Sequence, residues 1–397
     1  MLDIGQIHRN EYELERDRSI SIVSAESPGR IHFLGDQGDP ICGFYLSAAI
    51  DRYIQVAVNM RKDNSFRFYA ADLSERKRST LANLKYRRED RWANYLKTAI
   101  SVFTGLGYPM KGMNFSFCGN IPQQIGLASS TAIETAAAAA LRSLLRVQIS
   151  DMDLAQKLYE THCQLFSGTA SLADYQICLL ARKDQFLFMD MSAGEIKKIK
   201  SPFSRFRILL VDSRVPRLGT ENEVAARKAD ILKGLQLLSQ KLDGASFKDF
   251  ASEDLLESLG DFPEQIRRRS MHIVEEIHRL YDASDALQRN DLASLAKIIF
   301  HSHESLRDLY EISCPEIDWL VKRAQEIEGA AGARMIGYGF GGSTYIIIRR
   351  ELVEEYKRRL EEYERIFGFR PVIYEVKLAT GTRIVPERRG VYADTAD

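Results

Sequence analysis

The chain has 397 residues, a length that exceeds one ordinary domain and predicts two, each able to bury its own core. Hydrophobic residues make up 45% and charged residues 28%, which is typical of globular proteins and argues against a disordered or fibrous chain. Lys plus Arg and Asp plus Glu each total 55, so the net charge of zero argues against nucleic acid or an anionic membrane as the partner.

The cysteines and the apolar residues bear on the cellular setting. The five cysteines are widely spaced and never form a C-x-x-C pair, which argues against a disulfide framework or a zinc site. Residues 1–17 are polar and mixed in charge, and no run of about eighteen apolar residues occurs. We therefore expect a reducing, cytoplasmic setting, with no export signal and no membrane span.

Strand and helix patterns alternate through the first part of the chain. Residues 54–60 and 65–69 are short apolar or alternating segments that predict strands. Residues 92–106 have apolar positions at helical spacing, and residues 112–118 return to a strand pattern after a Gly-Tyr-Pro break. Residues 129–145 are rich in Ala and Leu without Gly or Pro, which predicts a buried helix.

The second half of the chain is predicted to be more helical. Long amphipathic helices are expected at residues 222–242, 266–289 and 351–367. Strands are expected at residues 185–189, 206–212, 332–349 (interrupted by glycines) and 371–377. A Ser-Pro break predicts a domain boundary near residue 205, giving domains 1–205 and 206–397, with the last strand able to pack back on the first domain.

Residues 122–132 (Pro-Gln-Gln-Ile-Gly-Leu-Ala-Ser-Ser-Thr-Ala) form a loop that leads into the Ala-rich helix. Gly126 allows a close backbone approach, the three hydroxyls can contact phosphate, and the helix start offers free N–H groups. Thr131 and Glu134 also fit a capping box, so a plain helix cap explains the same residues about equally well. No Lys follows the glycine, which excludes a Walker A loop.

Two other segments carry unusual residues. Residues 27–36 (Ser-Pro-Gly-Arg-Ile-His-Phe-Leu-Gly-Asp) place an arginine between a Pro-Gly turn and a strand, where it is a permanent cation or, equally, a surface ion-pair partner. Residues 332–343 (Gly-Ala-Arg-Met-Ile-Gly-Tyr-Gly-Phe-Gly-Gly-Ser) hold five glycines, which indicates tight turns or backbone lying against a ligand.

Together these segments resemble the signature motifs of the GHMP kinases, and of galactokinases in particular. The loop at residues 122–132 is similar to the second motif, residues 27–36 to the N-terminal galactokinase signature, and residues 332–343 to the third motif. Residues 92–97 and 303–316 resemble further galactokinase blocks. The matches occur in order over residues 26–380.

The resemblance implies an α+β, two-domain GHMP kinase fold. The N-terminal domain would be like the second domain of ribosomal protein S5, the C-terminal domain ferredoxin-like, and the active site would lie in the cleft between them. The implied activity is ATP-dependent phosphorylation of the anomeric hydroxyl of galactose or a related sugar, with Mg²⁺ as the cofactor and a monomer or weak homodimer as the assembly. Alternatives are a kinase for galacturonate, N-acetylgalactosamine or arabinose, or a non-catalytic sensor.

The resemblance also implies the site residues. Arg30 would stabilise the transition state and Asp174, in the segment at residues 168–176, would orient or deprotonate the sugar hydroxyl. Residues implied in ATP binding are Pro122, Gly126, Leu127, Ala128, Ser129, Ser130 and Thr131. Residues implied in substrate binding are Asp36, Gln37, Asp39, Ser171, Gly341 and Gly342, and those implied in metal binding are Ser130 and Glu160.

Departures from the galactokinase pattern gather on the sugar side. Galactokinases carry Glu-His-Thr-Asp-Tyr where residues 36–40 are Asp-Gln-Gly-Asp-Pro, and Tyr338 and Ser343 replace a glycine and a cysteine of the third motif. A family tyrosine that can meet the sugar is missing from residues 220–227. The identity of the sugar therefore stays open.

Overall fold

Two β-sheets organise the chain in the computed structural model, which describes residues 3–14, 19–36, 43–166, 170–216, 219–257 and 262–386. Within these residues the larger sheet has eight strands, in the order β12-β1-β2-β5-β3-β4 with β6 and β7 continuing from β2. Its strands are β1 (Val23–Leu34), β2 (Phe44–Met60), β3 (Ser65–Ala70), β4 (Glu75–Thr80), β5 (Met113–Gly119), β6 (Gln185–Asp190), β7 (Glu195–Lys200) and β12 (Arg383–Val385).

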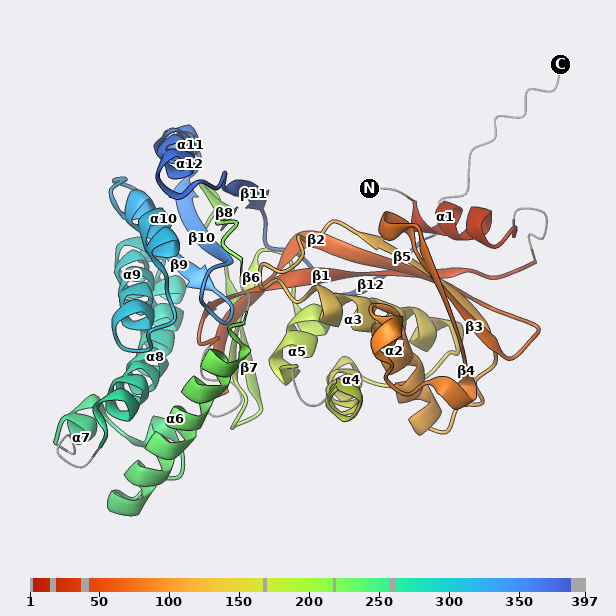
Figure 1. Cartoon of the computed structure of the whole chain (residues 1–397), viewed down its shortest axis with the longest axis horizontal. Coiled ribbons are helices and arrows are strands. Elements are labelled where there is room, and N and C mark those ends of the chain that lie inside the picture. Colours follow the sequence, from red (N-terminus) through yellow and green to blue (C-terminus); the bar gives the residue numbers. More distant parts are fainter. Residues whose placement is uncertain are drawn as a thin grey trace.

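Helices cover the large sheet on both faces (Figure 1). One face carries α2 (Ala93–Gly105), α3 (Ser129–Leu144), α4 (Asp151–Phe166) and α5 (Leu172–Leu180), and the other carries α1 (Ile4–Glu11). Helix α3 packs on β1 and β2 and is buried from Thr131 to Leu141. Its run of alanines keeps the helix thin, which lets it lie close to the sheet while neighbours pack on its other sides.

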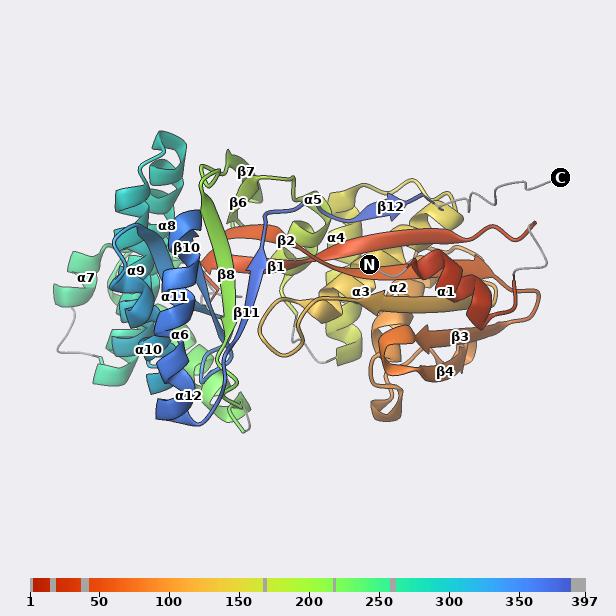
Figure 2. The same cartoon turned by 90° about the horizontal axis from the view of Figure 1, so that it is seen from above.

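The smaller sheet has four antiparallel strands among the described residues, in the order β11-β8-β10-β9. They are β8 (Phe206–Asp212), β9 (Ala330–Ile336), β10 (Ser343–Arg349) and β11 (Val372–Val376). The accompanying helices are α6 (Glu221–Lys241), α7 (Ser252–Glu257), α8 (Glu264–Arg289), α9 (Leu292–Asp308), α10 (Pro315–Gln325), α11 (Val353–Arg359) and α12 (Glu361–Phe367). Figure 2 shows this sheet standing between its helices and the end of the large sheet.

The chain crosses between the sheets twice. It leaves the large sheet after β7 and enters the small one at β8, and this change of sheet is where we propose the domain boundary. After β11 it returns, and β12 pairs with β1 through the register Glu26↔Arg383. The Arg383 guanidinium also bonds to the Glu26 carboxylate at 2.6 Å, so the return is fixed by charge as well as by strand pairing.

The predicted elements are found, with two differences in the second half. The glycine-interrupted strand is two strands, β9 and β10, joined by the loop at residues 337–342. The helix predicted at residues 351–367 is divided at Leu360 into α11 and α12. No helix within the described residues is both long and apolar enough to cross a membrane.

Candidate active site

The loop at residues 120–128 leaves the start of α3 open to a ligand. Gly126 and Ala128 both have left-handed backbone conformations, with φ of 86° and 57°. Ala128 is the residue that precedes the helix, and it has no side chain that could cap it. The first N–H groups of α3 therefore lack the usual N-cap bond, and together with the helix dipole they can receive an anion.

Glu134, the second residue of the possible capping box, does not cap α3 but bonds to neighbouring helices. Its side chain is fully buried, and its two oxygens form hydrogen bonds with His162 Nδ1 at 2.8 Å and the Tyr175 hydroxyl at 2.5 Å. These bonds tie α3 to α4 and α5. The capping-box interpretation is therefore wrong.

A cavity of about 650 Å³ lies over this loop. Its lining includes Gly126 of the loop, Ser129 and Ser130 at the start of α3, and several aromatic residues. The aromatic wall includes Tyr86, Trp92, Tyr95 and Phe166, with Tyr95 and Phe166 stacked at 5.1 Å between ring centroids. Such a cavity suits a ligand with a flat apolar part and an anionic part.

Arg30 and Asp174 form a bidentate ion pair beside the loop. Arg30 Nε lies 2.6 Å from Asp174 Oδ1 and Nη2 lies 2.9 Å from Oδ2, while Nη1 donates to the Gly126 carbonyl at 2.5 Å. Both side chains are about nine-tenths buried. A Cβ atom at Gly29 would lie 3.1 Å from the Leu127 carbonyl oxygen, so a glycine there lets β1 run directly against the loop.

The pair keeps Asp174 ionised. Burial by itself would raise the pKa of Asp174, but the charge of Arg30 and a hydrogen bond from His32 outweigh it and hold that pKa well below its usual range. A carboxylate in this state can accept a hydrogen bond from a ligand hydroxyl at neutral pH. A guanidinium next to it can stabilise negative charge nearby.

His32 is a member of the site that the sequence interpretation missed. Its Nε2 lies 2.9 Å from Asp174 Oδ1 and its Nδ1 lies 2.6 Å from the Ser47 hydroxyl. His32 is two residues after Arg30 on β1, and alternate residues of a strand face the same side. The two-residue spacing from Arg30 is therefore the feature of the sequence that could have identified His32 as part of the site.

Asp36 joins the two sheets. Its Oδ1 accepts from Arg334 Nη2 at 2.7 Å and its Oδ2 accepts from the Gly337 N–H at 3.0 Å. Arg334 is fully buried and also contacts Glu276 at 3.3 Å, and the Glu276 carboxylate accepts from the Gly35 N–H at 3.2 Å. The acid implied in sugar binding thus has both oxygens engaged by the protein, although it still lines a small cavity with Lys228 and Tyr338.

The loop at residues 337–342 packs against the loop at residues 120–128. The Ser343 hydroxyl donates to the Ile125 carbonyl at 2.8 Å, and a Cβ atom at Gly126 would lie 3.5 Å from Gly337 Cα. Gly341, with φ of 112°, lies against Val215, and the Gly342 carbonyl accepts from the Ser213 hydroxyl at 2.7 Å. Tight packing within the protein accounts for these glycines, and their role toward a substrate stays a prediction.

The other predicted site residues divide into three groups. Ser171 is buried at the start of α5, with its hydroxyl 3.4 Å from that of Tyr45. Glu160 lies on the exposed face of α4, bonded to Gln156 and Lys157, and is not among the residues that line the cavity with Ser130. Gln37 and Asp39 lie outside the described residues.

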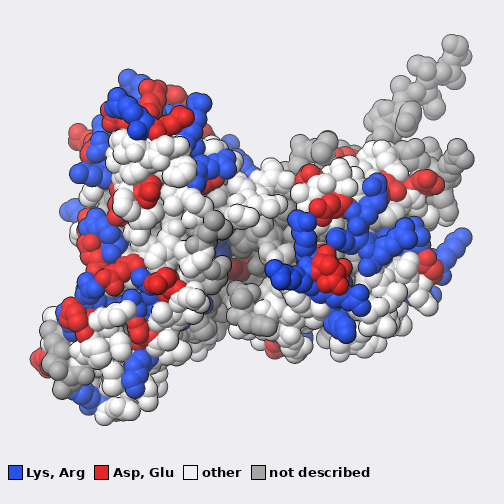
Figure 3. Space-filling model, viewed as in Figure 1, with Lys and Arg blue, Asp and Glu red and all other residues white. Residues whose placement is uncertain are grey.

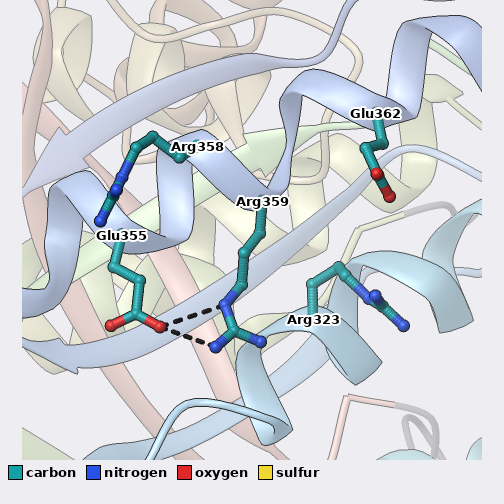
Figure 4. A pocket seen from close by; sticks show the side chains of 5 residues that line it. All are labelled: Arg323, Glu355, Arg358, Arg359 and Glu362. Atoms are coloured by element: carbon teal, nitrogen blue, oxygen red, sulfur yellow. Dashed lines mark hydrogen bonds and ion pairs between the residues drawn. The ribbon is translucent and has the colours of Figure 1, made fainter.

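A second hollow on the surface of the described residues is lined by charges of both signs. A depression between α10, α11 and α12 is lined by Arg323, Arg358 and Arg359 together with Glu355 and Glu362, and Figure 4 shows Arg359 bonded to Glu355. Its charges are thus partly balanced within the depression. Figure 3 shows both signs of charge on the helical lobe at the left and many basic side chains on the lobe at the right. The cavity over α3 belongs to that second lobe, and Arg88 and Arg91 are among its lining residues.

Comparison with protein families finds matches in both halves of the chain. Residues 94–182 match the GHMP kinases N terminal domain and residues 283–365 match the GHMP kinases C terminal model. A Treponema pallidum protein that carries galactokinase as a provisional name is 36% identical over 97% of each chain. The galactokinase of Thermotoga maritima is 29% identical over 91% of this chain and 99% of its own.

Comparison with solved structures gives the same fold. The Lactococcus lactis galactokinase, solved in complex with galactose, superposes with a TM-score of 0.88 at 24% identity, covering 96% of this chain and 99% of its own. The Methanococcus jannaschii mevalonate kinase superposes with a TM-score of 0.64 at 18% identity. The two-domain GHMP kinase fold predicted from the sequence is confirmed. The chain belongs to the galactokinase family of the GHMP kinases, which are ATP-dependent phosphotransferases, and its acceptor is a sugar hydroxyl.

Proposed function

We propose that the chain is a sugar 1-kinase that transfers the γ-phosphate of ATP to the anomeric hydroxyl of galactose or a related sugar. The observation that carries the proposal is the buried bidentate pair of Arg30 and Asp174, which is joined to the phosphate-side loop through the Gly126 carbonyl. The relatives named galactokinase supply the reaction and the default sugar.

ATP would occupy the cavity over α3. Its phosphates would lie at the start of the helix, where backbone N–H groups and the hydroxyls of Ser129 and Ser130 are available. Thr131, also implied in ATP binding, is buried and does not line the cavity. Its base would lie against the aromatic wall that includes Tyr86 and Trp92. The cavity volume of about 650 Å³ falls in the range for ligands of this size.

Asp174 and Arg30 would then act on the sugar hydroxyl. Asp174, kept ionised, accepts the hydrogen bond of the hydroxyl and turns its oxygen lone pair toward the γ-phosphorus. Its low pKa makes it a weak base, so the proton passes to it late, as the new O–P bond forms and the hydroxyl becomes acidic. Arg30 balances the charge that gathers around this transfer.

Mg²⁺ would supply charge neutralisation on the β- and γ-phosphates. Among the described residues no group of three or more His, Cys, Asp or Glu side chains could hold a metal ion, so the phosphates and water would provide most ligands. The Ser130 hydroxyl at the start of α3 is the protein oxygen best suited to join them. Glu160, bonded to Lys157 on the exposed face of α4, is not supported as a ligand.

A kinase for galacturonate is the second candidate. The small cavity that Asp36 lines also holds Lys228, whose ammonium lies 5.6 Å from the centroid of the Tyr338 ring. A cation here suits a carboxylate on the sugar, whereas the Asp36 carboxylate, which would suit a neutral hydroxyl, is already bonded to Arg334. The non-catalytic sensor is disfavoured because a protein that only binds needs no Arg30 and Asp174 pair.

The cellular setting and the assembly complete the proposal. The four cysteines within the described residues are all unpaired, which fits a reducing, cytoplasmic location. A monomer or weak homodimer is the expected state, and light scattering on the purified chain measures it directly.

A coupled ADP-release assay with Mg-ATP tests the activity across galactose, galacturonate, N-acetylgalactosamine, arabinose and glucuronate. We expect turnover on one sugar, lost in Asp174→Asn and retained in Asp230→Asn. Asp230 is the control, because it also pairs with an arginine, Arg269, and is not among the residues that line either cavity of the proposed site. Silence on the whole panel, in protein that still binds ATP, would favour the sensor.

A further inference from the structure

His32 and Ser47 form a cross-strand pair behind the Asp174 carboxylate. They lie directly opposite one another in the register of β1 and β2, and both are buried. His32 Nδ1 lies 2.6 Å from Ser47 Oγ, and the His32 ring packs on Tyr45 at 4.8 Å between centroids. Ser47 therefore holds the imidazole through Nδ1 and Tyr45 packs on its ring, while Nε2 is directed at Asp174.

The chemistry of the partners determines where the protons lie. An ionised Asp174 can only accept, so His32 Nε2 carries a proton and donates it. Burial, reinforced by the charge of Arg30, lowers the pKa of His32 and keeps the ring neutral. Nδ1 is then an acceptor, and the Ser47 hydroxyl donates to it. Ser47 thus selects the tautomer that Asp174 requires.

The two oxygens of Asp174 are not equivalent. Oδ1 accepts from Arg30 Nε at 2.6 Å and from His32 Nε2 at 2.9 Å, whereas Oδ2 accepts from Arg30 Nη2 at 2.9 Å. A carboxylate oxygen has room for about two donors. Among the hydrogen bonds that the described residues make, Oδ2 is thus the oxygen with capacity left for a ligand hydroxyl.

We propose that His32, held by Ser47, is a positioning residue that saturates Oδ1 of Asp174 and leaves Oδ2 as the acceptor for the sugar hydroxyl. The inference rests on the proposed role of Asp174. Without the imidazole, Oδ1 loses one of its two donors and also becomes available to the hydroxyl. The hydroxyl would then bind in more than one orientation, and only one of them points its oxygen at the γ-phosphorus.

Steady-state kinetics of the whole chain with Mg-ATP and its best sugar test this role. In His32→Phe we expect kcat to fall roughly ten- to a hundredfold, because a hydrogen bond to a charged group is lost, while the KM for ATP is unchanged. His32→Gln, which keeps an N–H donor, should recover part of the loss. Ser47→Ala should lower kcat roughly threefold to tenfold and add nothing in the His32→Phe background.

His8 supplies the matched control. It is also a buried histidine, with Nδ1 2.9 Å from Ser116 Oγ and Nε2 2.8 Å from Asn59 Oδ1, but its partners include no carboxylate and it belongs to α1. Burial lowers the pKa of His8 to about 4, so this ring is neutral too. His8→Phe should lower the melting temperature much as His32→Phe does, with kcat near the wild-type value.

The outcomes separate the two proposals. Wild-type kcat in His32→Phe, or an equal loss of kcat in His8→Phe, would overturn the positioning role. Asp174→Asn that keeps full turnover would instead overturn the proposed role of Asp174 itself. If His32→Phe fails to fold, Ser47→Ala decides, because it removes one oxygen atom from the same hydrogen-bonded chain and a wild-type kcat there contradicts the proposal.

Discussion

The phosphate side and the sugar side of the proposed site are built in different ways. The phosphate side is mostly backbone: the loop at residues 120–128, the open start of α3, and a close approach of β1 at Gly29. The sugar side is mostly side chains, in particular Asp36 bonded to Arg334 and Lys228 beside Tyr338. The first kind of site recognises a group common to all ATP-dependent relatives, whereas the second can change with the acceptor.

This difference explains why the departures from the galactokinase pattern gather where they do. A backbone site depends on φ values and N–H directions, so it tolerates few changes at Gly126 or Ala128. A side-chain site changes its chemistry with one substitution. Asp36 is one methylene shorter than the family glutamate, and in this chain its carboxylate is bonded across to the small sheet.

Removing the Asp174 carboxylate should give the largest effect, because Asp174 lies where the two sides meet. Asp174→Asn should lower kcat roughly 10²- to 10⁴-fold, with little change in the Kd for ATP, in rapid-quench measurements of phosphoryl transfer. Since the Arg30 charge holds the pKa of Asp174 well below its usual range, kcat in the wild type should not fall through protonation of Asp174 as the pH drops from 8 to roughly 5. Phosphoryl transfer by Asp174→Asn at the wild-type rate would contradict the proposed role of Asp174.

Glu276 tests whether buried charge holds the sugar side. Burial would raise its pKa, but the charges of Arg279 and Arg334 lower it to about 2, so its contribution to stability is present above pH 4.5 and is lost as the pH falls toward 2. Glu276→Gln should reduce the free energy of unfolding at pH 7 by about 3–5 kcal/mol and flatten its dependence on pH below 4.5. Glu354→Gln, which breaks an exposed pair with Lys357, should change stability by less than about 1 kcal/mol in the same denaturant titrations.

Gly126 tests the phosphate side. In Gly126→Ala the backbone must hold φ near 86° with a Cβ atom, at a cost of about 1–2 kcal/mol, although space is open to 3.5 Å. We expect the KM for ATP to rise roughly five- to thirtyfold with the KM for the sugar unchanged. Gly107→Ala has a similar φ of 82° outside the cavity, and it should leave both constants unaltered. A rise in the sugar KM would show that the two sides are not separable.

Lys228 gives the smallest and most specific effect. If the acceptor is galacturonate, Lys228→Gln should lower kcat/KM for that sugar roughly two- to fivefold, since its partly exposed charge is worth about as much as a surface ion pair. Turnover of galactose and the KM for ATP should not change. Lys233→Gln, on the exposed face of the same helix, is the control. Equal losses on a neutral and an acidic sugar would remove the argument for galacturonate.

The sequence predicted the fold and the loop that leads into α3 well, because both rest on local patterns. Alanine content and helical spacing located α3, and the loop before it carries its motif in consecutive residues. The long β1 and the helices α4, α5, α9 and α10 were not predicted. Helices α4 and α5 pack on each other, and α9 and α10 pack on β9, so their apolar positions are determined by tertiary contacts within each lobe.

Side-chain contacts that join distant parts of the chain could not be predicted from the sequence. The hydrogen bond from Arg334 to Asp36 spans 298 residues, and Glu134 was compatible with a local cap until its bonds to α4 and α5 were known. His32 could have been predicted from the sequence, because it follows Arg30 by two residues on β1 and alternate residues of a strand face the same side. Glu160 shows the limit of the resemblance, which implied a role in metal binding for a side chain that lies on the exposed face of α4, bonded to Gln156.

The position of the phosphate on the product is the most direct test of sugar 1-kinase activity. The wild-type chain should be incubated with Mg-ATP and the sugar it turns over, and the product examined by ³¹P NMR with proton coupling. We expect one new phosphorus resonance coupled to the anomeric proton, and none when Asp174→Asn replaces the wild type for the same time. Coupling to a proton at another carbon, or product formed equally well by the variant, would contradict it.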